Sequence, residues 1–277
     1  MVNRYLQVEG ASIYYEVEGD GPYLILVPGG NGGGEIFRRL RSHLTKHFTV
    51  VIYDRRGYSR SKLVGSQDYK NRLDTEADDI YNLMRNLTSE SFVIFGFSSG
   101  GAISLKYLTK YPKTVYKMFL HEPVTNLGAL PDSEGLRKFH TDMYNTYKNE
   151  GQDAAIKMCG KMYLTDLDYK TTVHKQLGGT RSDWSLYFEH EVQVYPFYNT
   201  NTYMIENNKD KVVLLYGIEC VNLFIHRPVK SISEYLDKEL YPFPGGHLGY
   251  LTETDKFAAE FIKVCKKNFV IKNIPKL

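Results

Sequence analysis

A serine flanked by glycines interrupts an apolar stretch near the middle of the chain. Residues 93–104 read VIFGFSSGGAIS, and Ser98 is the central residue of a Gly-x-Ser-x-Gly pattern. Glycines on both sides remove the Cβ atoms that would clash in a sharp strand-to-helix turn, so such a turn can push a serine hydroxyl out of a sheet. The pattern predicts that Ser98 is a nucleophile. A merely flexible turn is the alternative interpretation of the same pentapeptide.

The residues after Ser98 offer a place for developing negative charge. A helix predicted from Gly100 to about Lys110 directs its N-terminal N–H groups and the positive end of its dipole toward the serine. Ser99 is expected to contribute its backbone N–H, and not its side chain, to an oxyanion hole.

A second N–H group is expected from the loop VPGGNGGGEIF, residues 27–37, which we call the oxyanion loop. Its glycines allow close approach of the backbone to a substrate, and Gly30 or Asn31 would supply the N–H. The rival interpretation is phosphate binding. It is weaker because the spacing is not Gly-x-Gly-x-x-Gly and no Gly-Lys-Ser/Thr follows.

A serine hydroxyl is a weak nucleophile and needs a base within hydrogen-bond reach. Among the 8 histidines, His247 stands out because LYPFPGGHLGY places it in a Pro/Gly loop directly after the last predicted strand. This is the carboxyl edge of the sheet, where Ser98 is also expected and where open α/β sheets bind ligands. We predict that His247 is the general base. The other histidines are interpreted as solvated or structural.

The carboxylate that would orient His247 has two candidates. Glu122 follows the predicted strand 115–120, and Glu219 follows the predicted strand 212–216. Either residue can equally be an ordinary loop carboxylate, so the residues alone leave the choice open.

The elements that must position these side chains alternate along the chain. Short apolar runs separated by stretches of helical period are typical of strands joined by crossover helices. The predicted strands are 4–8, 12–18, 23–27, 48–53, 92–95, 115–120, 212–216 and 240–243, and the predicted helices include about 35–46, 74–88, 100–110 and 254–267.

The character of the chain changes after Pro123. Residues 124–209 contain helical stretches and no convincing strand, so we predict a core domain of 1–123 and 210–277 interrupted by a helical cap of 124–209. The cap is rich in aromatic residues, which either line an apolar pocket or form the core of a small helical subdomain. These are Tyr144, Tyr147, Tyr163, Trp184, Tyr187, Phe188, Tyr195, Phe197 and Tyr198.

Composition excludes several classes of protein. A net charge of +3 is too small to indicate nucleic-acid binding. No run of 18 apolar residues and no secretory segment is found, so we expect a cytoplasmic protein without stable membrane insertion. The 3 cysteines are odd in number and lack metal-ligand spacing, so neither a disulfide framework nor a metal is expected. A homodimer is compatible with the sequence.

Four motifs together resemble the α/β-hydrolase family over essentially the whole chain. They are GFSSG, PGGNGG, YDRRGYSRS and PGGHLGY, with the oxyanion-loop motif first in the chain and the histidine motif last. The resemblance implies an α/β fold with about eight mostly parallel strands, of which only the second is antiparallel, and a helical lid after the sixth strand. It also implies that Asp54, Arg55 and Gly57 are mainly structural.

The sequence departs from the family at the acid. The usual position, three residues after Gly217, holds Cys220, which cannot act as a carboxylate. Some members of the family carry the acid after the sixth strand, where Glu122 stands, so we favour Glu122 over Glu219.

The resemblance implies a serine hydrolase that acts through Ser98, His247 and Glu122, without a metal or an organic cofactor. The aromatic residues of the cap favour small to medium acyl esters as its substrates. Peptidases, thioesterases and carbon–carbon hydrolases share the same triad and stay open. A second hypothesis, motivated by Cys220, is a ligand-binding or signalling protein that keeps the fold without catalysis.

Overall fold

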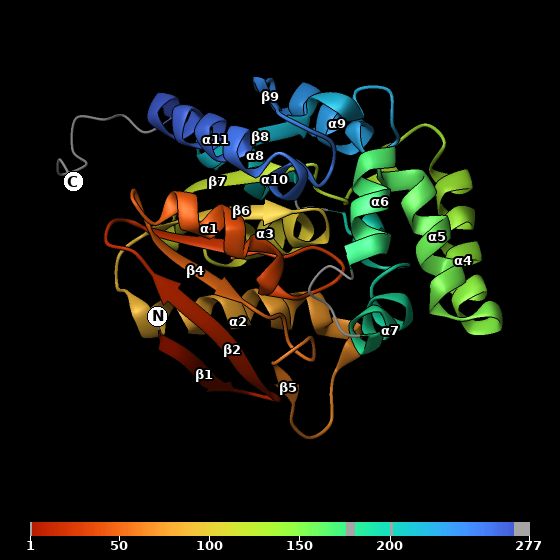
Figure 1. Ribbon diagram of the computed structural model, residues 1–277, viewed down its shortest axis with the longest axis horizontal. Helices are drawn as coiled ribbons and strands as arrows, with labels where there is room; N and C mark the ends of the chain where they lie inside the picture. The colour runs from red at the N-terminus through yellow and green to blue at the C-terminus, as the bar shows by residue number, and fades with distance from the viewer. Residues whose placement is uncertain (1, 176–180, 200–201, 269–277) are drawn as a thin grey trace.

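The computed structural model describes residues 2–175, 181–199 and 202–268, and its centre is a single twisted sheet (Figure 1). The strands are β1 (Val2–Val8), β2 (Ala11–Glu18), β3 (Tyr23–Val27), β4 (Thr49–Tyr53), β5 (Lys62–Leu63), β6 (Phe92–Phe97), β7 (Val115–His121), β8 (Val212–Gly217) and β9 (Leu240–Phe243). Their order is β1-β2-β4-β3-β6-β7-β8-β9, and β5 lies off this path and pairs with β2. Strand β2 pairs antiparallel with β1, β4 and β5, and all other pairs are parallel.

The fold class predicted from the sequence is confirmed. All eight predicted strands are present, and β2 alone runs against the others. The one additional strand among the described residues, β5, has no sequence signal because it is only 2 residues long and follows no apolar run. Residues 24–27 of β3 are fully buried, as expected for a parallel strand covered on both faces.

Helices cover both faces of the sheet. On one face pack α2 (Arg72–Leu87), α3 (Ser99–Lys110) and α9 (His226–Leu236), whose apolar residues share a core with alternate strand residues. On the other face pack α1 (Arg38–Leu44) and α11 (Thr254–Asn268). Because successive side chains of a strand point to opposite faces, the sheet contributes to both cores. This three-layer arrangement holds the carboxyl ends of the parallel strands at one common edge.

Among the described residues, five α-helices lie between β7 and β8. They are α4 (Ser133–Glu150), α5 (Gln152–Tyr163), α6 (Asp166–Lys175), α7 (Arg181–His190) and α8 (Thr202–Glu206). In Figure 1, α4 to α7 gather at one end of the sheet, away from both chain termini. Residues 176–180 and 200–201 of the predicted cap lie outside the described residues. Tyr195 and Ile205 pack into the core beside α2 and α3.

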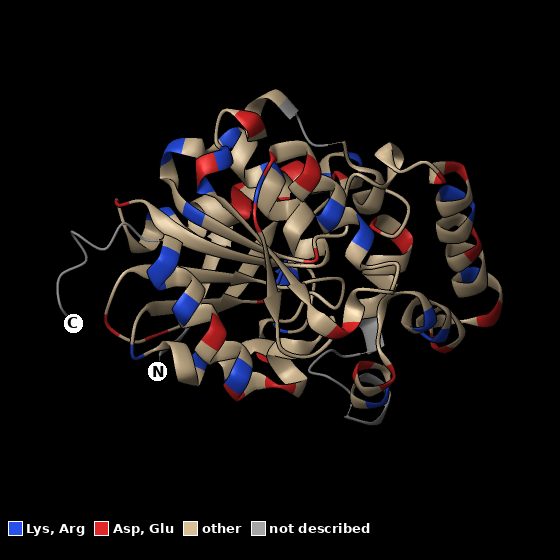
Figure 2. Ribbon diagram, turned by 90° about the horizontal axis from the view of Figure 1, so that it is seen from above, with Lys and Arg blue, Asp and Glu red and all other residues tan. Residues whose placement is uncertain are grey.

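Charged residues lie mainly on the outer helices, where both signs are interspersed, while the strands between them carry few charges (Figure 2). Within the described ranges, no helix is both long enough and apolar enough to cross a membrane.

Candidate active site

Ser98 occupies the strand-to-helix turn that the sequence predicts. Strand β6 ends at Phe97 and helix α3 begins at Ser99, which leaves Ser98 between them with φ 53° and ψ −123°. A positive φ is strained for a residue with a side chain, and such strain persists only where the surroundings enforce it.

The glycines around Ser98 are required by close contacts. A Cβ on Gly100 would lie 2.3 Å from the carbonyl oxygen of Val27, and one on Gly96 would lie 2.4 Å from the hydroxyl of Ser104. Side chains at either position would therefore separate α3 from the sheet. The turn exists because the pattern supplies glycine at both contacts.

His247 and Glu122 meet at the carboxyl edge of the sheet. His247 follows β9, Glu122 directly follows β7, and the Nδ1 atom of the imidazole lies 2.8 Å from Oε2 of the carboxylate. The other carboxylate oxygen accepts a hydrogen bond of 3.1 Å from the backbone N–H of Gly217. Both side chains are buried. The fixed carboxylate can only accept, so Nδ1 carries the proton and Nε2 is the nitrogen able to accept one.

The environment keeps Glu122 ionised. Burial alone would raise its pKa, but the hydrogen bond from His247, the neighbouring His121 and the N–H of Gly217 together lower the pKa below its ordinary value. A carboxylate that stays charged at neutral pH can stabilise an imidazolium that forms on His247.

His247 also lies beside the serine turn. The ring of Phe97, the residue immediately before Ser98, has its centroid 4.6 Å from that of His247. The structure therefore brings Ser98, His247 and Glu122 to one edge of the sheet.

The second acid candidate is placed differently. Glu219 lies in a short 3-10 helix after β8 with an exposed side chain, and its backbone N–H donates to the carbonyl of Gly245. The adjacent Cys220 is fully buried, and burial and the nearby Glu122 carboxylate raise the pKa of its thiol. Cys220 is therefore a neutral neighbour of Glu122.

The oxyanion loop runs directly past Ser98. A Cβ on Gly29 would lie 3.0 Å from the Cβ of Ser98, and one on Gly30 would lie 2.9 Å from the ring of Tyr187 on α7. The loop turns back on itself through a 3.0 Å hydrogen bond from the N–H of Gly32 to the carbonyl of Gly29. Gly30 and Asn31 thus occupy the tip of a tight turn beside the serine. The N–H of Ser99 lies in the first turn of α3, where N–H groups have no partner within the helix.

Sequence reasoning missed one buried carboxylate near this site. Asp168 of α6 is fully buried, and its Oδ2 lies 2.3 Å from the place a Cβ on Gly246 would occupy, next to His247. Burial raises the pKa of Asp168, while His247 and the N–H groups of Thr165 and Leu248 oppose that rise. The only local signal is the Thr165-x-x-Asp168 spacing, which predicts a helix cap and no function.

No group of three or more histidine, cysteine, aspartate or glutamate side chains that could hold a metal ion occurs in the part of the chain that the structure describes.

Comparison with known proteins identifies the family. A family model described as alpha/beta hydrolase fold matches residues 22–207. The uncharacterized hydrolase YraK of Bacillus subtilis (strain 168) is 33% identical over 270 residues, which cover 96% of each chain. The chain belongs to the α/β-hydrolase family.

More distant relatives agree with the assignment. Serine hydrolase BPHL of Homo sapiens is 25% identical over 92% of this chain and 84% of its own. A thermophilic esterase from Thermogutta terrifontis superposes with a TM-score of 0.76 at 15% identity, covering 96% of this chain and 99% of that one, which shows a shared fold. Family membership and these relatives together indicate that the protein is a hydrolase.

A second histidine of this α/β hydrolase makes its stability depend on pH. His121, at the end of β7, is fully buried, and its Nε2 donates to the carbonyl of His247 at 3.2 Å. Burial lowers the pKa of His121 from 6.5 to about 4; the proximity of His247 adds to the effect, and Glu122 partly opposes it. Between these two values the unfolded chain binds the proton more tightly than the folded protein does. The free energy of unfolding therefore falls as the pH falls through this range.

We expect His121 to account for about 2 kcal/mol of the stability lost between about pH 7 and pH 5. Urea unfolding of the wild type and of His121→Gln at both pH values measures this contribution. Between the two pH values, the free energy of unfolding of the variant should fall by about 2 kcal/mol less than that of the wild type. His43→Gln, which changes a partly exposed imidazole, is the control for removing a histidine elsewhere in the fold. Equal losses in wild type and His121→Gln would refute the assignment.

Proposed function

We propose that the protein is a serine hydrolase of small to medium acyl esters, acting through Ser98, His247 and Glu122. The observation that carries the proposal is the 2.8 Å contact between His247 Nδ1 and Glu122 beside the strained turn of Ser98. A base that is oriented by a carboxylate, next to a projecting serine, is the arrangement that activates a hydroxyl nucleophile.

The proposed reaction has two stages. In the first, the hydroxyl oxygen of Ser98 attacks the ester carbonyl while Nε2 of His247 takes its proton, and the imidazolium then protonates the departing alcohol. In the second, His247 takes a proton from water as the water oxygen attacks the acyl-enzyme. The imidazolium then returns this proton to the oxygen of Ser98 as the acyl–oxygen bond breaks and the carboxylic acid leaves. The N–H groups of Ser99 and of Gly30 or Asn31 would hold the oxyanion in both stages.

The inserted helices α4 to α8 are proposed to act as a cap that bounds the acyl site. Most of the cap aromatics form one apolar cluster with each other, which supports a structural role for Tyr147, Tyr163 and Phe188. Tyr187 belongs to the same cluster but also rests on Gly30, so it is the aromatic best placed to limit the size of an acyl group. A small-molecule ester as partner and a cytoplasmic location stay predictions.

The proposal is tested with a serine-directed fluorophosphonate probe and a series of p-nitrophenyl esters of increasing chain length. We expect labelling of the wild type and hydrolysis that favours short and medium chains. One thioester and one aminoacyl amide distinguish the related activities. A folded wild type that neither reacts with the probe nor cleaves any substrate would contradict the proposal and favour the ligand-binding alternative.

A further inference from the structure

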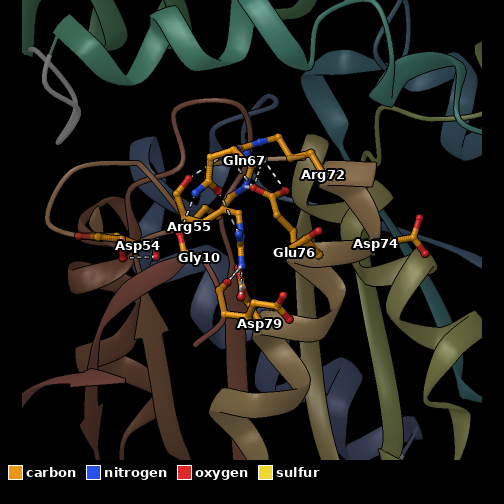
Figure 3. A network of polar contacts seen from close by, with 12 residues as sticks. Gly10, Asp54, Arg55, Gln67, Arg72, Asp74, Glu76 and Asp79 are labelled. Atoms are coloured by element: carbon orange, nitrogen blue, oxygen red, sulfur yellow. Dashed lines mark hydrogen bonds and ion pairs between the residues drawn. The ribbon is translucent and has the colours of Figure 1, made fainter. Parts of the chain in front are cut away.

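Four buried charged side chains form a cluster beside the oxyanion loop. They are Arg55, Arg72, Glu76 and Glu191, none of them more than 2% exposed. Nη2 of Arg55 lies 2.8 Å from Glu76 and 2.7 Å from Glu191. Arg72 contacts the same two carboxylates at 3.2 Å. Figure 3 shows Arg55, Arg72 and Glu76 converging above α2. Two positive and two negative charges balance in an interior where an unpaired charge would be costly.

Arg55 connects this cluster to the oxyanion loop. Its Nη1 atom donates to the carbonyl of Gly29 at 2.8 Å, and its backbone N–H donates to the carbonyl of Gly32 at 2.8 Å. These two carbonyls stand on either side of Gly30 and Asn31, whose N–H groups are the proposed oxyanion donors. Holding both carbonyls sets the direction in which the peptide groups between them point.

Glu191 brings the inserted helices into the same arrangement. It follows α7, and its backbone N–H donates to the carbonyl of Tyr187 at 2.9 Å. Its carboxylate accepts a hydrogen bond from the hydroxyl of Tyr58. The ring of Tyr58 lies where a Cβ on Gly32 would be, 2.0 Å away, just as the ring of Tyr187 lies over Gly30. Glu191 therefore reaches the loop by three routes: Arg55, Tyr58 and Tyr187.

We infer that Glu191 is a positioning residue for ester hydrolysis. It orients the Arg55 guanidinium that holds the carbonyl of Gly29, while the backbone N–H of Arg55 holds the carbonyl of Gly32. The N–H groups of Gly30 and Asn31 are thereby aimed at the oxyanion. The inference rests on the proposed serine hydrolase function. Without the charge of Glu191, the Arg55 guanidinium is attracted to Glu76 alone. Its hydrogen bond to the carbonyl of Gly29 then weakens. Misdirected donors weaken transition-state binding more than substrate binding.

The test compares Glu191→Gln with wild type in the full chain. We expect kcat for p-nitrophenyl butyrate to fall about 10- to 100-fold with KM changed less than about two-fold. Affinity for a trifluoromethyl ketone, which forms an oxyanion on Ser98, should fall in parallel, while affinity for butyrate, the product, should not. A residue that merely supported the fold would not separate these two ligands.

Asp79→Asn is the matched control. Arg56 and Asp79 form an equally buried pair, with Nε 2.7 Å from Oδ2, immediately next to the cluster. The guanidinium of Arg56 reaches the carbonyl of Glu9 and the side chain of Gln67, not the oxyanion loop. Asp79→Asn should therefore lose stability to urea but keep the wild-type kcat and ketone affinity.

A second variant covers the case in which Glu191→Gln does not fold. Tyr58→Phe keeps the ring against Gly32 but removes the hydroxyl that donates to Glu191, and it should lower kcat and ketone affinity together by about three- to ten-fold. If the wild type hydrolyses esters and the folded variants keep its kcat and ketone affinity, the inference is wrong. Equal losses in Asp79→Asn would also overturn it. An unreactive wild type would instead indicate failure of the proposed function.

Discussion

Replacing Ser98 by alanine is expected to abolish fluorophosphonate labelling and to lower kcat/KM for p-nitrophenyl esters by at least about 10⁴-fold. The variant has no hydroxyl to attack the ester, and His247 and the oxyanion donors can then only assist attack by water. Alanine is smaller than serine and would adopt the same positive φ, so the strand-to-helix turn at position 98 should persist. Labelling followed by mass spectrometry and steady-state kinetics measure the effect.

Ser99→Ala is the matched control for Ser98→Ala. Ser99 is buried at the start of α3, and only its backbone N–H is assigned a role. Its loss of a hydroxyl should leave labelling intact and change kcat/KM by less than about five-fold. Retained hydrolysis in Ser98→Ala, or loss of labelling in Ser99→Ala alone, would show that the nucleophile is misassigned.

Glu122→Gln is expected to lower kcat by about 10⁴-fold, the effect of replacing the triad carboxylate by an amide in serine proteases. The amide keeps the size of the side chain, and its oxygen can still accept from Gly217. It cannot stabilise an imidazolium on His247, and its NH₂ group favours the wrong tautomer of the ring. The measurement is steady-state hydrolysis of the ester preferred by the wild type, with urea unfolding to establish that the variant is folded.

Glu219→Gln provides the comparison. It removes the other strand-end carboxylate, whose side chain is exposed, and should change kcat by less than about two-fold. A large loss in Glu219→Gln with an active Glu122→Gln would reverse the assignment of the acid.

The strands and the serine turn are predictable because their signals are local. Residues 23–27 form an apolar run that is long enough for a strand and too short for a helix, and they are β3 in the structure. The turn at Ser98 requires glycine at positions 96 and 100, and the contacts of those glycines with Ser104 and Val27 explain why. Strand β5 lacked such a signal because its 2 residues are held only by pairing with β2.

The cluster around Arg55 had no comparable signal. Glu191 lies 133 positions from Tyr58 in the chain, and its surroundings in the sequence are those of an ordinary polar residue after a helix. Asp168 likewise reads as a helix cap. The role of such residues can be recognised only in the tertiary structure, where a distant segment buries them. A charge that costs little at the surface must be paired once it is buried.

The sequence by itself determined the family, the order of the strands along the chain and the turn that presents Ser98. The family follows from the resemblance of four motifs, whereas the strands and the turn follow from apolar periodicity and glycine placement, which act between near neighbours. Only the tertiary structure decided which carboxylate faces His247. Glu122 and Glu219 both follow strands, but the pairing of β7 with β8 lets Glu122 accept from Gly217 and turn its second oxygen toward an imidazole 125 residues away. That choice depends on register and loop packing between distant segments, which no local pattern encodes.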